Sequence, residues 1–186
     1  MTGAAPGFAG FYGKLPVRGD FVRSGLPGDA VDALDGWARA ALAASRAALG
    51  EDWMPCWMEA PVWRFALAPG VAGVSGLGGV WLPSMDQVGR CFPLIIAAEI
   101  SGAGAAWLDA AEALGFEAVT ADLAPEALAA RLAAVPPAPG DIPRAGGVWW
   151  TEGAPRKDAA RIETDGLPDP ADFLGLLADA AAIRVP

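Results

Sequence analysis

The chain has 186 residues, of which 54% are hydrophobic and 19% charged, and its formal net charge is −9. This composition excludes a largely disordered chain and supplies enough apolar side chains for one buried core. The acidic balance also disfavours nucleic-acid binding, because neutralising phosphates requires a large basic face. We therefore expect a single domain over residues 1–186 that binds no nucleic acid.

The first strong pattern is a helix over residues 29–49. Small and apolar side chains recur there at steps of three and four residues, namely Val31, Leu34, Ala38, Ala41, Leu42, Ser45 and Leu49. Pro27 and Asp29 suit the beginning of a helix, and Gly50 suits its end. The spacing predicts a helix with one face packed against the rest of the domain.

Short strands are predicted in the segments that follow. Residues 62–67 alternate loosely between large apolar and other side chains. Residues 79–82 and 92–100 are apolar runs on either side of a turn over residues 83–90. We expect all three segments to lie in one sheet.

The second half of the chain is predicted to contain mostly helices. Residues 105–114 have helical character, and Gly115 is expected to mark a bend or the end of that helix. A second helix is expected from Pro125 to about residue 134. Residues 172–183 are expected to close the chain as a third helix.

Two late strands complete the predicted sheet. Residues 147–151 form a strand that places Trp149 and Trp150 on opposite faces, because side chains alternate along a strand. Residues 161–163 are expected to pair beside it. Because strands and helices intermix, the predicted fold class is α/β, with a mixed, largely antiparallel sheet and helices on both faces in three layers.

Aromatic side chains are unusually rich in tryptophan, with eight Trp and one Tyr. Such large rings are buried or form contact surfaces. We expect most of them in the core. Trp53 and Trp57, which flank Pro55, are the candidates for an exposed aromatic patch.

The parts of common active sites are missing. The chain has no His, which excludes an imidazole base, a Ser-His-Asp set and His metal ligands. Cys56 and Cys91 are isolated, and the glycine-rich segment 73–79 leads into a strand-like run instead of a helix. We therefore expect a protein that is not an enzyme and holds no cofactor or metal.

No segment suits a membrane span or a signal peptide. Residues 65–85 carry no charge, but two prolines and five glycines interrupt them, whereas a spanning helix needs roughly 20 consecutive apolar residues. Residues 1–10 lack a basic region and a long apolar region. We expect a cytoplasmic protein without membrane insertion.

Residues 11–27 form a basic, aromatic segment in an acidic chain. Lys14, Arg18 and Arg23 gather there around a single acid, Asp20. We expect this segment to cross the edge of the sheet with its cations outward and with its apolar side chains, Tyr12, Phe21 and Val22, in the core. A pairing of Lys14 or Arg18 with Asp20 is expected to serve the fold, because partly buried charges need partners.

Several ordered motifs together resemble one known family. They are GFYGKLP at residues 10–16, GDF at 19–21, WRF at 63–65, PSMD at 83–86 and GRCFPL at 89–94, with VWW at 148–150 and GLP at 166–168 also fitting. Their order and spacing are similar to those of the TagF family of type VI secretion-associated proteins. The resemblance implies a three-layer α/β domain and a non-enzymatic, post-translational repressor of type VI secretion. It also implies a partner, the forkhead-associated scaffold protein of the secretion machine.

The motif residues admit a structural and a binding interpretation. Structurally, Ser84 and Asp86 brace the turn before Gly89, with Arg90 as an ion-pair partner. In the binding interpretation, one rim that docks a partner is formed by Lys14, Arg18, Asp86 and Arg90. With the neighbouring motif residues, the candidate interaction residues are Lys14, Arg18, Asp20, Arg23, Ser84, Asp86 and Arg90.

A small-molecule-binding or hydrolase domain is the alternative to a binding module. It would use Lys14, Asp20 and Asp86 in a cleft lined by the motifs. Mutual burial of these side chains favours the structural interpretation, whereas a formed cavity with converging, unpaired polar groups favours the alternative. The sequence leaves the oligomeric state and the contact face open.

Overall fold

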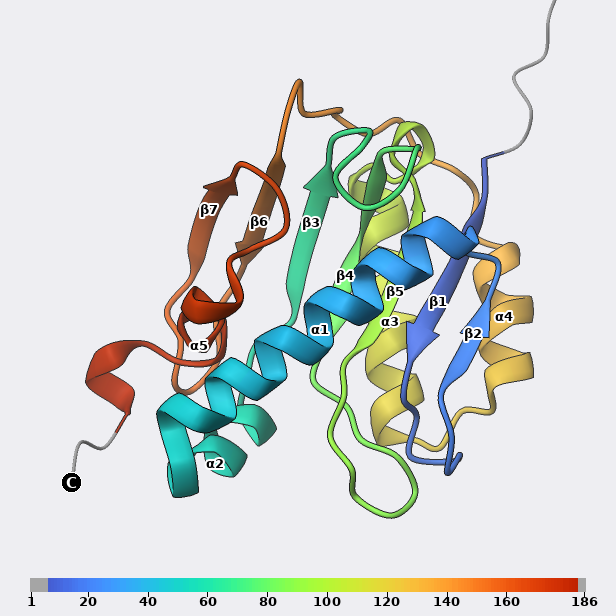
Figure 1. Cartoon of the computed structure of the whole chain (residues 1–186). Coiled ribbons are helices and arrows are strands. Elements are labelled where there is room, and N and C mark those ends of the chain that lie inside the picture. The colour runs from blue at the N-terminus through green and yellow to red at the C-terminus, as the bar shows by residue number, and fades with distance from the viewer. Residues whose placement is uncertain (1–6, 184–186) are drawn as a thin grey trace, which may run out of the picture.

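A computed structural model describes residues 7–183 of the chain. Seven strands pair antiparallel throughout into one sheet with the order β2-β1-β5-β4-β3-β6-β7 (Figure 1). The strands are β1 Ala9–Gly13, β2 Val22–Ser24, β3 Trp63–Leu67, β4 Leu77–Leu82, β5 Leu94–Glu99, β6 Gly147–Thr151 and β7 Ala160–Thr164. The predicted strands are therefore all present, and β2 and β7 form the two edges of the sheet.

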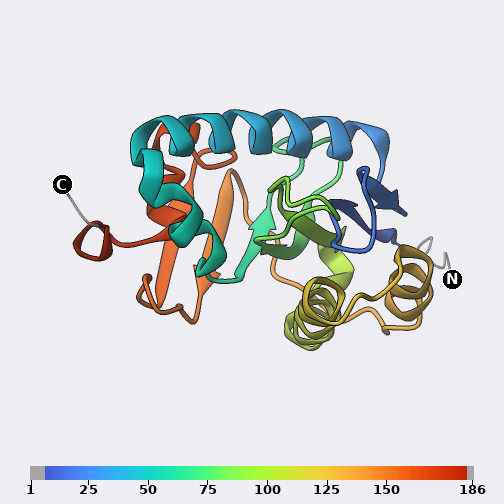
Figure 2. The same ribbon diagram turned by 90° about the horizontal axis from the view of Figure 1, so that it is seen from below.

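Helices cover both faces of this sheet. They are α1 Gly28–Leu49, α2 Trp53–Met58, α3 Ala105–Thr120, α4 Pro125–Ala133 and the short α5 Leu174–Leu177. Figure 2 shows α1 lying along one face, with α2 and α5 on the same side, and α3 and α4 on the other face. This arrangement confirms the predicted α/β fold class with helices on both faces of the sheet in three layers.

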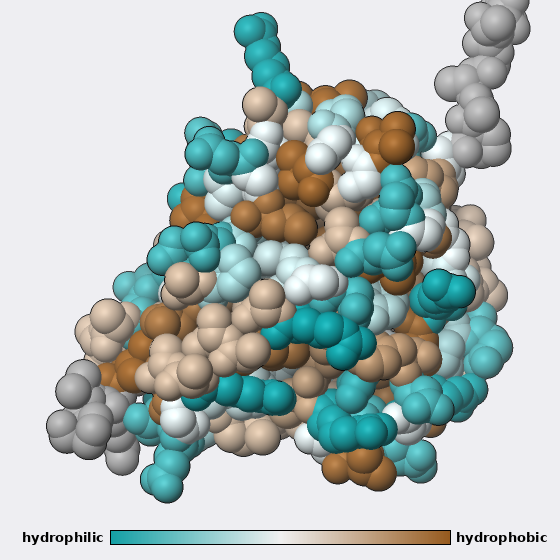
Figure 3. Space-filling model, viewed as in Figure 1, coloured by the Kyte–Doolittle hydropathy of each residue, from teal (hydrophilic) through white to brown (hydrophobic). Residues whose placement is uncertain are grey.

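The helix α1 confirms the predicted pattern. Its periodic side chains, among them Leu34, Ala38 and Leu42, are buried against the sheet, and Trp37 donates a hydrogen bond of 2.8 Å to the carbonyl of Pro168. The opposite side of the helix carries exposed alanines interrupted by charged residues, which Figure 3 shows as a pale brown band between teal patches. Packing of one face against the core therefore stabilises this helix.

The helix α3 differs from its predicted bounds, because it continues through Gly115 to Thr120. A Cβ atom at position 115 would lie 2.8 Å from Cδ1 of Leu82 and 3.1 Å from Cδ1 of Ile96. The glycine thus allows α3 to approach the sheet closely and does not end the helix.

The single helix predicted over residues 172–183 is wrong. The structure has α5, then the extended Ala178, then a 3-10 turn at residues 180–182. The carboxylate of Asp179 accepts hydrogen bonds from Nζ of Lys157 and from the backbone N–H of Asp158, the latter at 2.7 Å. These contacts with the β6–β7 connection outweigh local helix propensity and end α5.

The aromatic patch predicted at Trp53 and Trp57 is also wrong. Both rings are buried, and they stack on each other with centroids 5.1 Å apart. Their indole N–H groups are satisfied: Trp53 donates to Oγ of Ser45 at 2.9 Å, and Trp57 donates to the carbonyl of Ser84 at 3.1 Å. The tryptophans of α2 therefore belong to the core on the α1 side.

Among the helices between residues 7 and 183, none combines the length and the apolar character that a membrane span requires.

Candidate binding surface

Two connections carry the motif residues, and they meet at one end of the sheet. The β1–β2 connection follows Gly13, and the β4–β5 connection spans residues 83–93. Because β1 pairs with β5, the backbone N–H of Lys14 reaches the carbonyl of Pro93 at 3.3 Å, and the N–H of Gln87 reaches the carbonyl of Arg18 at 2.8 Å. Gly13 has a φ of 141°, and a Cβ atom there would lie 1.9 Å from the Pro93 carbonyl oxygen. Only glycine allows this close approach.

Asp86 lies at the centre of the contact between the two connections. Its Oδ2 atom is 2.8 Å from Nζ of Lys14 and 2.6 Å from Nε of Arg90. Its Oδ1 atom accepts backbone N–H groups from Val88 at 3.1 Å and from Arg90 at 2.9 Å. Arg90 also donates from Nη2 to the carbonyl of Gly19 at 2.5 Å. The buried Asp86 carboxylate thus stabilises the turn in which it lies and binds the β1–β2 connection through Lys14.

The pKa of Asp86 reflects this environment. Burial by itself raises the pKa, because it disfavours the charged form. The hydrogen bonds from Lys14, Arg90 and two backbone N–H groups outweigh burial and hold the pKa well below its ordinary value. The carboxylate is therefore ionised and fully engaged at neutral pH.

Ser84 adds a second link between the same connections. Its hydroxyl donates to the carbonyl of Lys14 at 2.8 Å. Its own carbonyl accepts the indole N–H of Trp57 and the backbone N–H of Phe92, both at 3.1 Å. Ser84 thus joins the β1–β2 connection, the β4–β5 connection and α2.

Several predicted pairings and positions need correction. Lys14 is buried and pairs with Asp86, so its predicted place at an outer rim is wrong. Arg18 pairs with Glu126 of α4 at 3.1 Å, and neither cation contacts Asp20 through an ion pair. Asp20 is exposed and has no side-chain hydrogen bond within residues 7–183. The reason is the geometry of the β1–β2 connection, in which Lys14 is buried against the β4–β5 connection whereas Asp20 is exposed to solvent.

Of the four residues expected to share one rim, two are at the surface. Arg18 and Arg90 are exposed, whereas Lys14 and Asp86 are buried beneath them. Arg23 is also exposed, on the edge strand β2. Of the candidate cations predicted from the sequence, Arg18, Arg23 and Arg90 are therefore exposed.

The prediction that Phe21 lies in the core is wrong, because 38% of the residue is exposed. Its ring stacks on Tyr12 with centroids 5.6 Å apart and meets the edge of Phe92 at 4.8 Å. Lys14 and Arg39 place their charged groups 5.0 Å and 5.1 Å from the centroid of the Phe21 ring. Phe21 therefore covers the ion-pair network from the solvent side. Tyr12 and Val22 are buried as predicted.

Sequence reasoning missed the link between this cluster and α1. The hydroxyl of Tyr12 donates to Oδ1 of Asp35 at 2.6 Å, and Asp35 accepts two hydrogen bonds from Nε of Arg39, at 2.9 Å and 2.8 Å. Burial and the adjacent Asp35 carboxylate raise the pKa of Tyr12. The only available sequence signal was the i, i+4 spacing of Asp35 and Arg39 on the predicted helix.

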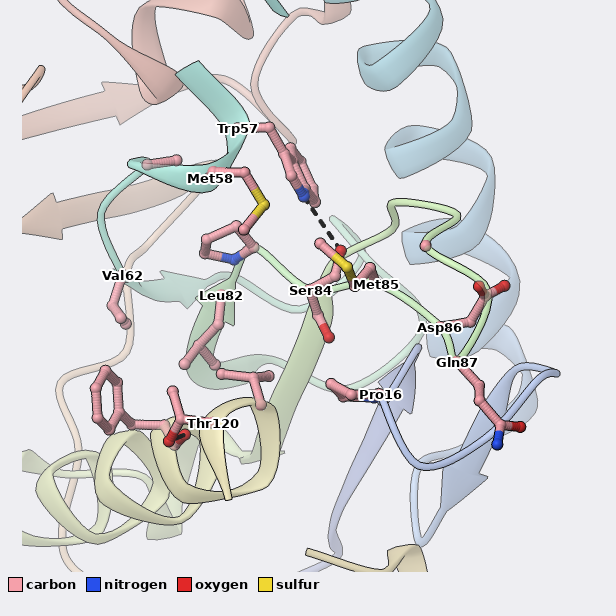
Figure 4. A pocket seen from close by; sticks show the side chains of 15 residues that line it. Pro16, Trp57, Met58, Val62, Leu82, Ser84, Met85, Asp86, Gln87 and Thr120 are labelled. Carbon is pink, nitrogen blue, oxygen red and sulfur yellow. Dashed lines mark hydrogen bonds between the residues drawn. The ribbon is translucent and has the colours of Figure 1, made fainter. Parts of the chain in front are cut away.

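A cleft of about 640 Å³ opens beside the network (Figure 4). Its walls come from the α2–β3 connection, the end of β4, the β4–β5 connection and the last turns of α3. Most of its lining is apolar and includes Pro16, Met58, Val62, Leu82, Met85, Phe116 and Val119. Figure 4 shows Met58, Val62, Leu82 and Thr120 around one space, with Asp86 and Gln87 to one side of it.

The cleft does not gather the residues that the hydrolase alternative requires. Lys14 and Asp86 are paired with each other, and neither Lys14 nor Asp20 lines the cleft. Within residues 7–183, the buried side-chain polar atoms without a hydrogen-bond partner are the indole nitrogens of Trp81 and Trp149, which also lie outside the cleft. The same part of the chain contains no cluster of three acidic or Cys side chains that could hold a metal ion. The geometry therefore favours mutual structural pairing of the motif charges.

The chain is similar to known proteins over most of its length. Residues 10–135 match the model of the TagF N-terminal domain, described as type VI secretion system-associated. The chain is also similar to the crystal structure of PA0076 from Pseudomonas aeruginosa PAO1, with a TM-score of 0.82 and 31% sequence identity. That similarity covers 91% of this chain and 94% of the other. No match was found among curated proteins. The residues matched by the family model include both connections and the whole lining of the cleft.

Proposed function

The chain belongs to the TagF family of type VI secretion-associated proteins, and on that premise we propose that it is a post-translational negative regulator of the secretion machine. It acts as a non-enzymatic binding module. Its partner is the forkhead-associated scaffold protein that promotes assembly of the machine. By holding the scaffold, it lowers secretion without changing the amounts of the machine's components.

One observation carries the non-enzymatic part of this proposal. Lys14 and Arg90 both pair with Asp86, and the Ser84 hydroxyl donates to a backbone carbonyl. Groups paired in this way are not free to act as a nucleophile or as a general base toward a substrate in the cleft. Their arrangement instead fixes the shape of the two connections and of the cleft wall, which supports a role in recognition.

The exposed cations suggest how the partner is approached. Arg18, which pairs with Glu126, and Arg23 are both exposed on the β1–β2 hairpin of a chain whose net charge is −9. A local basic area on an acidic protein steers an acidic partner surface and fixes its register. We therefore assign Arg18 and Arg23 to the rim of the scaffold-binding face.

Secretion assays test the proposed regulation. Deletion of the gene is expected to raise type VI secretion, and overproduction is expected to lower it. Immunoblots of the machine components provide the control, because their levels are expected to stay constant in both strains. Unchanged secretion in both strains would contradict the proposal.

A further inference from the structure

The lining of the cleft includes two large, exposed apolar side chains, one from each helical layer. Met58, at the end of α2, is 57% exposed, and Phe116, in α3, is 60% exposed. These helices lie on opposite faces of the sheet, so the cleft is the place where the two helical layers come together around the end of β4. Large, exposed apolar groups that line one open cleft are typical of a surface that buries another apolar surface.

The backbone of the β4–β5 connection offers few free hydrogen-bonding groups to an added strand. In the β4–β5 connection, the N–H groups of Asp86, Gln87 and Phe92 bind the carbonyls of Arg90, Arg18 and Ser84. Met85 and Cys91 also form a bridge across this connection. Because strand addition depends on free main-chain groups, binding here must rely on side-chain contacts.

The lining favours apolar anchors over a polar small molecule. A small-molecule site needs a few free polar groups that orient the ligand. The buried polar side chains of the lining, Ser84 and Asp86, already have partners. Met58 and Met85 are flexible and polarisable, and methionines of this kind adapt to the shape of an apolar side chain.

The charge at one end of the cleft indicates which charge the partner carries beside its apolar side chains. Asp86 has two cationic neighbours, Lys14 and Arg90, so this group of three carries one net positive charge. Arg90 does not itself line the cleft, but it adjoins the lining residue Gly89, and its side chain is 62% exposed. Glu59, which follows the lining residue Met58 but does not line the cleft, pairs with Arg156 at 2.6 Å. Nε and Nη2 of Arg90 already donate to Asp86 and to the Gly19 carbonyl, so a carboxylate on the partner would pair with the remaining N–H groups of its guanidinium.

We propose that this cleft binds an acidic amphipathic helix of the partner protein. Large apolar residues on one face of that helix enter between Met58 and Phe116, and an acidic residue beside them pairs with Arg90. A helix fits because it presents side-chain anchors at spacings of three and four residues while its own backbone groups are satisfied. The inference rests on the proposed function, with the forkhead-associated scaffold protein as the source of the helix.

The test measures binding of the purified full chain to the purified scaffold protein by biolayer interferometry. Met58→Glu and Phe116→Glu place a charge in the cleft, and each is expected to raise Kd by at least about tenfold, as loss of a central anchor does. The matched control is Val74→Glu, which adds the same charge at a side chain that is 84% exposed and outside the cleft. Its Kd is expected to equal that of the wild type. Circular dichroism and melting curves establish that all three variants fold.

Hydrogen–deuterium exchange locates the contact independently. In the complex, slower exchange is expected over residues 54–62 and 112–121. If the wild type binds the scaffold while both cleft variants bind equally well, the cleft assignment is overturned and the proposed function stands. If the wild type does not bind the scaffold, both fail. If the wild-type chain is a dimer and Met58→Glu dissociates it, the cleft serves self-association and the inference is overturned.

Discussion

Nζ of Lys14 lies 2.8 Å from Oδ2 of Asp86, and only 9% of the Lys14 side chain and 0% of the Asp86 side chain are exposed. The two residues are 72 positions apart in the chain and join the β1–β2 and β4–β5 connections. A buried charge requires a partner, because burial without one costs several kcal/mol. The pair therefore fixes the position of one connection relative to the other, and with it the wall of the cleft.

Removal of Lys14 is expected to destabilise the domain. Breaking a buried pair by deleting one partner costs about 3–5 kcal/mol, and Lys14→Met is expected at the lower end because Arg90 still compensates the carboxylate. Urea denaturation measures the free energy of unfolding. The matched control is Arg18→Met, which removes an exposed cation and is expected to leave that free energy nearly unchanged. Equal stability of both variants would show that the buried pair does not hold the connections together.

Asp86 is expected to make stability depend on acidic pH. Its pKa is lower in the folded protein than in the unfolded chain, where an Asp has a pKa of about 3.9. Its contribution is therefore fully present above that value and decreases as the pH falls further toward the folded-state pKa. Denaturation curves from pH 7 to pH 3 are expected to show a steeper loss below about pH 4 for the wild type than for Asp86→Asn. The variant Lys14→Met, which weakens the cause of the low pKa, is expected to lie between them. Parallel curves for all three proteins would contradict the assignment.

Two glycine substitutions are expected to have opposite effects. Gly115→Ala adds a methyl group against the buried Leu82 and Ile96, and overpacking of about 1–3 kcal/mol exceeds the gain in helix propensity of about 1 kcal/mol. The free energy of unfolding is expected to fall by about 1 kcal/mol. Gly36→Ala, on the open side of α1 with no atom within 4 Å, is expected to raise it by about 0.5–1 kcal/mol. Stabilisation by Gly115→Ala would mean that α3 does not need this close approach.

Charge reversal at the hairpin is expected to separate binding from folding. Arg18→Glu combined with Arg23→Glu is expected to leave the melting temperature nearly unchanged, because both side chains are exposed. The same variant is expected to weaken scaffold binding and to release repression of secretion. Arg144→Glu combined with Arg161→Glu makes the same charge change at exposed positions outside the hairpin and serves as the control. Loss of folding with binding intact in the soluble fraction would place the docking face elsewhere.

The sequence predicted those parts of the fold that local periodicity determines. The helix α1 and the alternating Trp149 and Trp150 follow from side-chain spacing alone, and the structure confirms both. The prediction of one helix over residues 172–183 failed because contacts from Lys157 and Asp158 to Asp179 decide where α5 ends. Such contacts join residues far apart in sequence and leave no local pattern.

The candidate surface was predictable only as a set of motifs. Their family resemblance placed Lys14 and Asp86 among the important residues, but proximity to Asp20 suggested the wrong partner for Lys14. The actual pairing depends on the antiparallel register of β1 with β5, which brings the two connections together. A cleft lined by the motifs was expected for the alternative, but its walls could not be predicted, because they include α2, β4 and α3, which meet only in the folded chain.

The most direct test of the account is an isothermal titration of the purified chain with the purified forkhead-associated scaffold protein from the same organism. We predict saturable binding that weakens as the salt concentration rises, because exposed arginines contribute to recognition. The absence of a saturable signal, at concentrations where both proteins remain folded and monodisperse, would contradict the proposal that this protein restrains type VI secretion by holding the scaffold.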